Sequence, residues 1–552
     1  MHFKSLFLCL YLTANYAIAQ NSITAKIDSL LSSQVSESGP GLSVGVLHQD
    51  SMIYTSQLGL ANLEYNTPIS EDSKFPIASI TKQFTAACIG VLEQKGALSV
   101  NDNVREYIPE LPDYGSKIQI KHLLNHTSGL RNHNVLLDLQ GFDYTHQGYT
   151  NESIESLIFR QKDVNNVPGE KMLYGNSNYV LLALIVERVS GKPIVQFAEE
   201  EIFEPLGLEN TSFRKSLFEV FKNPVDTYFQ QDGSYQQHTS ANLCIGAGGV
   251  ITTVSDLLKW STIYWQNDHP KQWLATFLST QDTLNDGTLL NYGRGVFLDN
   301  YVNLQTIRHG GRGWASRTIL LVVPEEQISV VAFANSAETN VSGIAYSILD
   351  ILFPENIAPE SQSQYVEYEA GNLSDIVGDY QELNSDLLMK IFVENDTLKA
   401  KASMGRFAVP LQRIGENTFQ RIDNASVRHT FFADDNRKWD MTVDFGGAMF
   451  YFERANLANP NSVNPEEFAG NYHSEELNVT YHFTEENDRL VLNYPNNPDI
   501  ILQPRREDEF GSNRRTRYTF ERNAEGKVNK LYVAAEGTVK NIVFVKTINK
   551  VE

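Results

Sequence analysis

The stretch that decides the fold is Ser79-Ile80-Thr81-Lys82, which lies between Pro76 and an uncharged run from Phe84 to Leu92. The uncharged run predicts a helix that is buried on most of its surface. Residues three apart share a helix face, so Ser79 and Lys82 are neighbours, with Ser79 in the first turn, where free N–H groups favour negative charge. If burial lowers the lysine pKa from about 10.4, the pair suits a serine nucleophile. The alternative is a capped helix with a solvated lysine.

Length and charge limit the possible classes of protein. The chain has 552 residues, which predicts two to four domains, and 41% hydrophobic with 20% charged residues is typical of a soluble globular protein. The formal net charge of -22 argues against nucleic acid or an anionic membrane surface as partner, because both attract basic patches.

Residues 1–19 have the pattern of a cleavable signal peptide. Lys4 precedes an apolar core, and Ala17-Ile18-Ala19 forms a small-x-small cleavage site. No later apolar run reaches the eighteen or so residues of a membrane span. The expected location is therefore periplasmic or secreted. Cys88 and Cys244 remain after cleavage, and their apolar or glycine-rich settings favour small core residues over a disulfide.

The first 350 residues begin and end with predicted hairpins. The apolar runs Leu42–Leu47 and Met52–Leu58 form one, and Thr318–Val323 with Ile328–Phe333 form the other. Between them the pattern is helical. The fold class is therefore α/β with an antiparallel sheet and a helical part around Ser79. Further helices are expected at Asn178–Val189 and Thr252–Trp260.

A histidine pair and a glycine run resemble a zinc site and a phosphate loop, but their neighbouring residues do not fit either. His122 and His126 have the spacing of zinc-binding histidines on one helix, but no glutamate or third ligand accompanies them. The run from Gly246 to Gly249 lacks the Lys-Ser/Thr ending of a phosphate loop. Neither a metal nor a cofactor is expected.

Three short motifs occur in an order and spacing that resemble a known superfamily. Ser79-x-x-Lys82, Tyr174-x-Asn176 and His309-x-Gly311 resemble the active-site motifs of serine β-lactamases and penicillin-binding proteins, in the branch of class C β-lactamases, DD-peptidases and esterases. The resemblance covers roughly residues 25–350. It departs from the usual pattern twice, with Gly175 in place of a serine and His309 in place of a lysine.

The resemblance implies a role for each motif residue. Ser79 attacks a carbonyl and is acylated, and proton transfer is shared by Lys82 and Tyr174, in either assignment as general base. Asn176 orients Lys82 and binds the substrate amide. His309, Gly311 and Arg312 contact substrate, with the backbone N–H groups of Ser79 and Arg312 forming the oxyanion hole.

Position 309 bears on the substrate class. A histidine with a reference pKa of about 6.5 is mostly neutral at pH 7 and binds a carboxylate less well than lysine. This favours an aminopeptidase, amidase or esterase over a β-lactamase, which is the first alternative. The resemblance implies a substrate such as a D-amino-acid-containing peptide, as for a D-aminopeptidase or DD-peptidase, or an ester. A second alternative, of another class, is a non-turnover receptor for penicillin or peptidoglycan fragments. If His309 binds a carboxylate when protonated, that preference depends on pH.

Beyond residue 356 the composition becomes β-rich and repeats. Gly378-Asp-Tyr380 recurs as Gly470-Asn-Tyr472, 92 residues on. The repeats predict two small antiparallel barrels, at residues 370–455 and 465–552, after a catalytic domain at 20–356. This order resembles that of bacterial D-aminopeptidases, whose two C-terminal domains are lipocalin-like barrels.

An arginine-rich segment lies in the second repeat. Five arginines fall within Arg505–Arg517 of this acidic chain. One interpretation is a solvated hairpin tip. The other follows from the resemblance: a loop of the last barrel, here Gly511–Thr516, reaches the catalytic cleft and restricts the substrates that enter.

Overall fold

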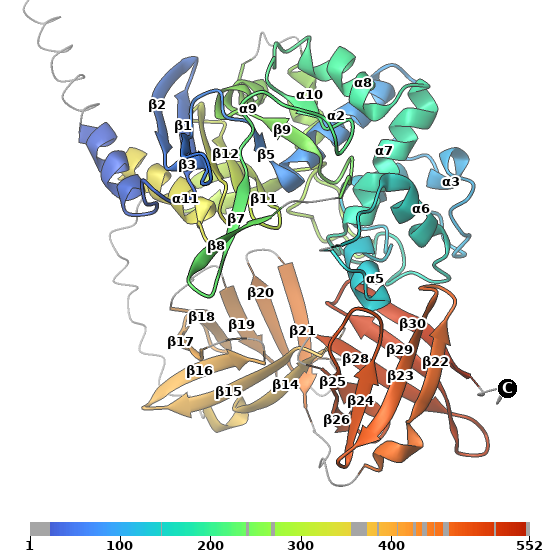
Figure 1. The fold of residues 1–552 in the computed structure, drawn as a ribbon. Helices are drawn as coiled ribbons and strands as arrows, with labels where there is room; N and C mark the ends of the chain where they lie inside the picture. The colour runs from blue at the N-terminus through green and yellow to red at the C-terminus, as the bar shows by residue number, and fades with distance from the viewer. Residues whose placement is uncertain are drawn as a thin grey trace, which may run out of the picture.

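The computed structural model describes most of the chain. It covers residues 22–144, 146–238, 242–266, 271–354, 373–383, 386–403, 405, 407–422, 427–432, 439–445, 448–455, 463–512 and 515–547. The predicted signal peptide lies outside these residues. A first domain occupies the upper part of Figure 1, and two β-barrels lie side by side beneath it.

An antiparallel sheet forms the centre of the first domain. Its strand order is β10-β11-β12-β13-β1-β2. The two predicted hairpins are confirmed as β1 with β2 and β12 with β13, and β13 pairs with β1, so the two ends of the domain meet in one sheet. The strands are β1 (Leu42–His48), β2 (Ser51–Leu58), β10 (Phe297–Tyr301), β11 (Leu304–Arg312), β12 (Arg317–Val323) and β13 (Ile328–Ala334).

Helices cover both faces of this sheet. On one face, side chains such as Ile319 and Leu321 pack against α11 (Val341–Leu352) and the helix at residues 22–32. On the other, Leu320 and Val322 belong to the core that includes α2 (Thr81–Gln94). This two-sided burial explains why the strands read as continuous apolar runs.

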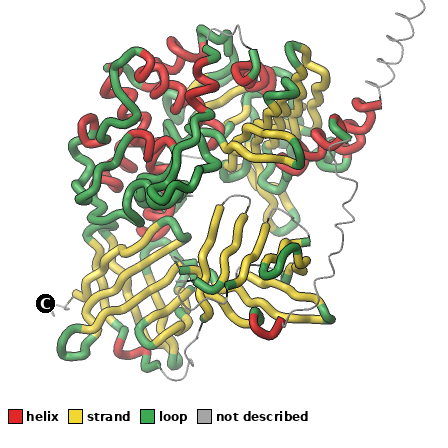
Figure 2. The backbone as a smooth tube through the Cα atoms, turned by 180° about the vertical axis from the view of Figure 1, so that it is seen from behind, coloured by secondary structure: helices red, strands yellow, loops and turns green. Residues whose placement is uncertain are grey.

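The helical part lies beside the sheet (Figure 2). The helices predicted at Asn178–Val189 and Thr252–Trp260 are α7 and α9. The helices of this part are α3 (Val104–Tyr107), α4 (Ile120–Leu124), α5 (His133–Gln140), α6 (Asn151–Phe159), α7 (Asn176–Ser190), α8 (Ile194–Ala198), α9 (Val254–Ser261) and α10 (Trp273–Leu278). The short strands of the domain include β5 (Phe75–Pro76), β7 (Thr227–Gln231), β8 (Ser234–His238) and β9 (Val250–Thr252).

The first barrel is closed by eight described strands, and the second is a nine-stranded antiparallel sheet. Barrel 1 comprises β14 (Gly378–Glu382), β15 (Leu388–Glu394), β16 (Thr397–Ala402), β17 (Val409–Arg413), β18 (Thr418–Arg421), β19 (Val427–Phe431), β20 (Met441–Phe445) and β21 (Ala448–Arg454). Barrel 2 comprises β22 (Gly470–Ser474), β23 (Val479–Glu486), β24 (Arg489–Asn493), β25 (Ile500–Ile501), β26 (Gln503–Arg506), β27 (Glu509–Gly511), β28 (Thr516–Arg522), β29 (Val528–Ala535) and β30 (Val539–Thr547).

Equivalent tyrosines show that the sequence repeat is also a structural repeat. Tyr380 donates a hydrogen bond to the Ile376 carbonyl at 2.8 Å, and Tyr472 donates to the Phe468 carbonyl at 2.9 Å. Each tyrosine therefore fastens the first strand of its barrel to the turn before it. Barrel 2 also shares a hydrophobic core with the first domain.

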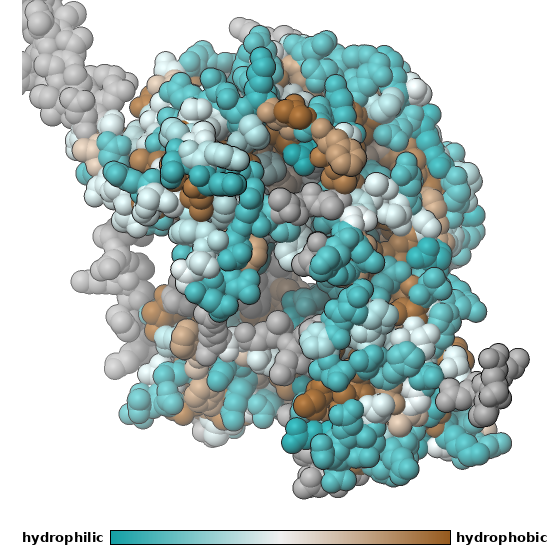
Figure 3. All heavy atoms as spheres, in the orientation of Figure 1, coloured by the Kyte–Doolittle hydropathy of each residue, from teal (hydrophilic) through white to brown (hydrophobic). Residues whose placement is uncertain are grey.

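The visible surface is mostly hydrophilic. Hydrophilic side chains dominate the face drawn in Figure 3, and apolar patches are scattered. Among the described residues, no helix is long and apolar enough to cross a membrane.

Candidate active site

Ser79 lies at a sharp turn between a strand and a helix. Strand β5 leads into the 3-10 turn η1 (Ala78–Ile80), and α2 follows directly. Ala78 has a φ of 46°, in the left-handed region that residues other than glycine rarely adopt. Ser79 is thus in the turn before the helix, one turn earlier than predicted, yet Lys82 still lies next to it.

Lys82 is fully buried and its amine has three polar neighbours. Nζ lies 3.0 Å from Ser79 Oγ, 2.9 Å from Asn176 Oδ1 and 3.0 Å from the Ala247 carbonyl oxygen. A neutral amine has two N–H bonds and one lone pair. Because the two carbonyl oxygens can only accept, they take both N–H bonds, and the lone pair is left for the Ser79 hydroxyl. Burial lowers the pKa of Lys82 to about 7, so a large fraction of this amine is neutral at pH 7.

Tyr174 is the second proton-carrying group at Ser79. Burial raises the pKa of its phenol, and its hydrogen bond with Ser79 opposes that rise only in part. The phenol therefore stays protonated at neutral pH. Its ring centroid lies 4.9 Å from Lys82 Nζ. Of the two assignments left open by the sequence, this arrangement favours Lys82 as the base and Tyr174 as the group that passes a proton on.

His126 packs against Tyr174 and hydrogen-bonds to the backbone of the next residue. His126 comes after the end of α4 and has a φ of 61°, so it does not lie on the same helix as His122. The helical spacing that suggested two zinc-binding histidines is therefore not formed. Nδ1 accepts hydrogen bonds from the Gly175 backbone N–H at 3.3 Å and from Asn178. Its ring packs 4.2 Å from that of Tyr174, measured between centroids. Sequence reasoning gave His126 no such role.

A glycine run supplies the carbonyl that binds Lys82. A side chain at Gly246 would collide with the Tyr179 carbonyl, because a Cβ there would lie 2.3 Å from that oxygen. The loop therefore packs against α7 closely enough for the Ala247 carbonyl to reach the amine. The glycines are visible in the sequence, but the contact of their loop with Lys82 is not.

His309 is buried and neutral. Its Nδ1 donates to the Gly310 carbonyl at 2.7 Å, so Nε2 is left to accept from the Tyr292 hydroxyl at 3.2 Å. Burial, with Lys82 nearby, lowers the pKa of His309 to about 3. The expectation that a protonated His309 selects carboxylates at physiological pH therefore loses its basis.

Gly311 allows strand β11 to approach Ser79. A Cβ at this position would lie 2.2 Å from the Ile77 carbonyl and 2.0 Å from Thr318 Oγ1. This close approach places strand β11 against the turn that carries Ser79, and Arg312, the next residue of the strand, lines the same clefts as Ser79.

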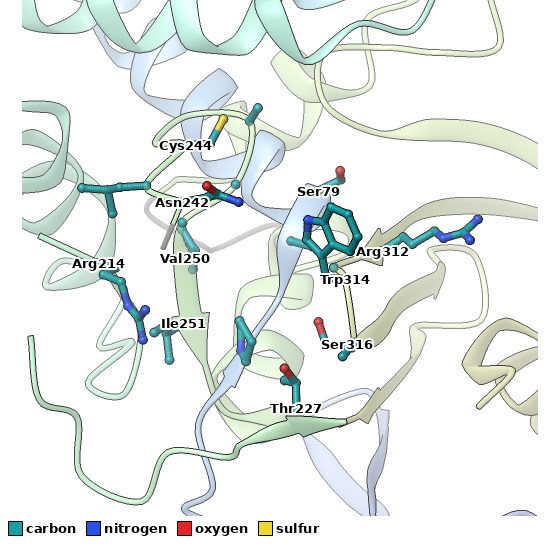
Figure 4. Close-up of a pocket in the computed structure, with 18 of the residues that line it drawn as sticks. Ser79, Arg214, Thr227, Asn242, Cys244, Val250, Ile251, Arg312, Trp314 and Ser316 are labelled. Carbon is teal, nitrogen blue, oxygen red and sulfur yellow. The ribbon is translucent and has the colours of Figure 1, made fainter. Parts of the chain in front are cut away.

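Two clefts meet at the nucleophile. One, of about 540 Å³, is lined by Asn134, Tyr149, Asn176, Arg214 and Trp314 among others. The other, of about 690 Å³, is lined by Tyr174, His309, Gly311 and residues at the start of α11. Ser79 and Arg312 line both, and Figure 4 shows the first cleft with Ser79 at its edge. A substrate can therefore extend to either side of the attacked carbonyl.

Cys244 lines the first cleft and Cys88 is buried in α2, and both are free thiols. Within the described ranges, no group of three His, Cys, Asp or Glu residues could hold a metal ion.

The arginine-rich segment binds the neighbouring barrel. Arg505 forms a two-pronged ion pair with Asp386 at 2.7 and 2.9 Å, and Arg506 pairs with Glu453, both in barrel 1. Arg517 donates to the Leu383 carbonyl at 2.5 Å. None of the segment's described residues lines the two clefts. The described residues of Gly511–Thr516 therefore contribute nothing to these linings. Residues 513 and 514 lie outside the described ranges, so the interpretation of this loop as a restriction on substrate entry stays a prediction.

A hydroxyl activated by a buried amine, beside a protonated phenol and between two clefts, defines a serine hydrolase. The family model described as Beta-lactamase matches residues 27–352, and the chain belongs to the beta-lactamase family.

Relatives extend the match into the barrels. A D-aminopeptidase of Brucella anthropi is 24% identical over 527 residues, which cover 90% of this chain and 93% of that protein. Penicillin-binding protein 4* of Bacillus subtilis is 28% identical over 289 residues, which are 49% of this chain and 62% of that protein, less than two thirds of its length. The octameric penicillin-binding protein homologue from Pyrococcus abyssi has a similar fold, with a TM-score of 0.55 and 24% identity over 78% of this chain and 99% of that one.

The ionisation of Lys82 predicts a pH profile. Activity requires its neutral form, so kcat/KM should fall about tenfold between pH 8 and pH 6, with the midpoint near 7. His309 should add no step above pH 5, because its pKa is about 3. Stopped-flow hydrolysis of matched neutral and carboxylate-bearing esters should give the same acid limb. If kcat/KM fell with rising pH for the carboxylate ester alone, the protonated form of His309 would bind that carboxylate, and the conclusion that His309 is neutral would be wrong.

Proposed function

We propose that this serine hydrolase cleaves amides or esters of D-amino acids, including short peptides that begin with one, through an acyl-enzyme on Ser79. The observation that carries the proposal is the match to a D-aminopeptidase, which runs through the first domain and both barrels. The neutral His309 supports it, because it offers no charge to a substrate carboxylate and little repulsion to a free amine.

The proposed reaction follows from the contacts of Ser79. The hydroxyl proton moves to Lys82 Nζ as Ser79 Oγ bonds to the carbonyl carbon. The backbone N–H groups of Ser79 and Arg312 stabilise the oxyanion. As the carbonyl carbon–nitrogen or carbon–oxygen bond breaks, Tyr174 gives its phenolic proton to the leaving amine or alkoxide and takes the proton held by Lys82 in its place. Water then hydrolyses the ester on Ser79 by the reverse path, which returns the proton to the Ser79 hydroxyl.

A substrate panel tests the substrate class. We expect D-aminoacyl p-nitroanilides to be hydrolysed at least about tenfold faster, in kcat/KM, than their L enantiomers. N-acetylated D-substrates and a chromogenic cephalosporin serve as matched controls for the free amine and for β-lactamase activity. Preference for the cephalosporin would favour the β-lactamase alternative, and a burst followed by no turnover would favour the receptor.

We further propose that the protein acts outside the cytoplasm after cleavage following Ala19. The charged, apolar and small-residue pattern of residues 1–19 supports this. N-terminal sequencing of protein from the native host tests it: Gln20 as the first residue is expected, and an intact N-terminus in the cytoplasm would contradict it.

A further inference from the structure

Barrel 2 holds a segment of the first domain, Arg131–Asn134, through buried polar contacts. Arg131 Nη1 lies 2.6 Å from Glu476 Oε2, and the exposed fractions of the two side chains are 0% and 3%. Arg131 Nη2 donates to the Asn541 carbonyl at 3.1 Å. The Asn132 backbone N–H donates to the Thr538 carbonyl, in the turn between β29 and β30, at 3.3 Å.

The other side of the same segment contacts the start of α7. Asn132 Oδ1 accepts from the Asn176 backbone N–H at 3.3 Å, and Asn134 Oδ1 accepts from Asn176 Nδ2 at 2.7 Å. Ser177 donates its hydroxyl to the Arg131 carbonyl at 2.7 Å. Because Asn134 takes the amide nitrogen of Asn176, the amide oxygen is the atom turned toward Lys82. The segment therefore fixes which end of Asn176 binds the catalytic amine.

The contacts of Glu476 make this connection rigid. Besides Arg131, its carboxylate accepts from the backbone N–H groups of Lys162 at 2.8 Å and Val543 at 3.4 Å. The preceding residue, Glu475, is 76% exposed and pairs with Lys162 at the surface. A buried carboxylate that accepts from three donors has one position, whereas a surface pair contributes little.

We propose that barrel 2 positions the active site, with Glu476 and Arg131 as positioning residues that hold the segment Arg131–Asn134 and, through it, keep Asn176 on Lys82. Barrel 2 is then required for the acylation step itself, whichever substrate the enzyme uses. Glu476 touches neither substrate nor nucleophile. Its effect passes through Arg131 and the asparagine side chains to the amine that activates Ser79.

The test compares Glu476→Gln with Glu475→Gln as the matched control. We measure the rate constant for acylation of Ser79 by a fluorophosphonate probe and its dependence on pH, on protein shown to be folded by circular dichroism. Glu476→Gln should lower the rate constant at least tenfold. It should also move the acid limb above pH 7, since a loosened segment admits water and reduces the desolvation that lowers the lysine pKa. Glu475→Gln should change neither quantity.

A purely structural role gives a different result. Glu476→Gln would then lower the melting temperature while the folded protein keeps its rate constant and acid limb, and that outcome overturns the proposal. If Glu476→Gln does not fold, Arg131→Lys replaces it, because lysine keeps the charge and loses the second donor to Asn541. If Arg131→Lys lowers the acylation rate constant and shifts its acid limb, the proposal is supported. If the rate constant and its dependence on pH are unchanged, the proposal is overturned.

Discussion

Ser79→Ala should abolish both acylation and turnover, with a loss in kcat of about 10⁴-fold or more. The reason is that Ser79 Oγ is the atom that faces the lone pair of Lys82 and lies where the two clefts meet. Intact-mass measurement after incubation with a fluorophosphonate should show one adduct on the wild-type protein and none on the variant.

A control variant separates loss of the nucleophile from disturbance of the cleft. Ser316 lines the first cleft with Ser79 but is not one of the three polar neighbours of the Lys82 amine, so Ser316→Ala should retain the adduct and most of the activity. Ser79→Ala should also unfold at a similar temperature, because the hydroxyl supports no core packing. Hydrolysis by Ser79→Ala near the wild-type rate would rule out the covalent route.

The sheet could be predicted because its signal is local. The runs Leu42–Leu47 and Thr318–Val323 are apolar, β-rich and bounded by polar turns, and they form strands as predicted. Ser79 and Lys82 are three residues apart, so they are neighbours whether the turn between them is 3-10 or α-helical. Only the exact start of the helix differed, because the strain at Ala78 leaves no mark in the sequence.

The supports of the site could not be predicted, because they depend on contacts between distant parts of the chain. The Ala247 carbonyl reaches Lys82 across 165 positions, and Arg131 reaches Glu476 across 345. A reference pKa also says nothing about burial, which is why a histidine expected to titrate near 6.5 is neutral at position 309.

The same reason explains why neither interpretation of the arginine-rich segment included its contacts with barrel 1. The sequence shows the charges at Arg505 and Arg506 but not the carboxylates they meet, which lie 119 and 53 positions away. Gly511 belongs to the same contact, since a Cβ there would lie about 2.0 Å from Asp386 Oδ1. This segment joins the two barrels, and barrel 2 meets the first domain through other turns.

Lys82→Met and Tyr174→Phe should each slow acylation by about 10²- to 10⁴-fold, and the double variant should be little slower than the worse single one. The two groups form one proton-transfer unit at Ser79: the amine lies 3.0 Å from Oγ, and the phenol is hydrogen-bonded to the same hydroxyl. Methionine keeps the length of the lysine without its amine, so the core around α2 stays filled. Single-turnover reaction with an activated p-nitrophenyl ester measures the step directly.

Tyr292→Phe is the matched control for loss of a phenol in this aromatic cluster. Its ring centroid lies 6.2 Å from that of Tyr174, but its hydroxyl contacts His309 and not Ser79. We expect this variant to acylate within a few-fold of the wild-type rate. If the losses from Lys82→Met and Tyr174→Phe multiply in the double variant, the two residues act independently, and the shared proton path through Ser79 is wrong. If they do not multiply while Tyr292→Phe stays active, the buried amine and the protonated phenol act together.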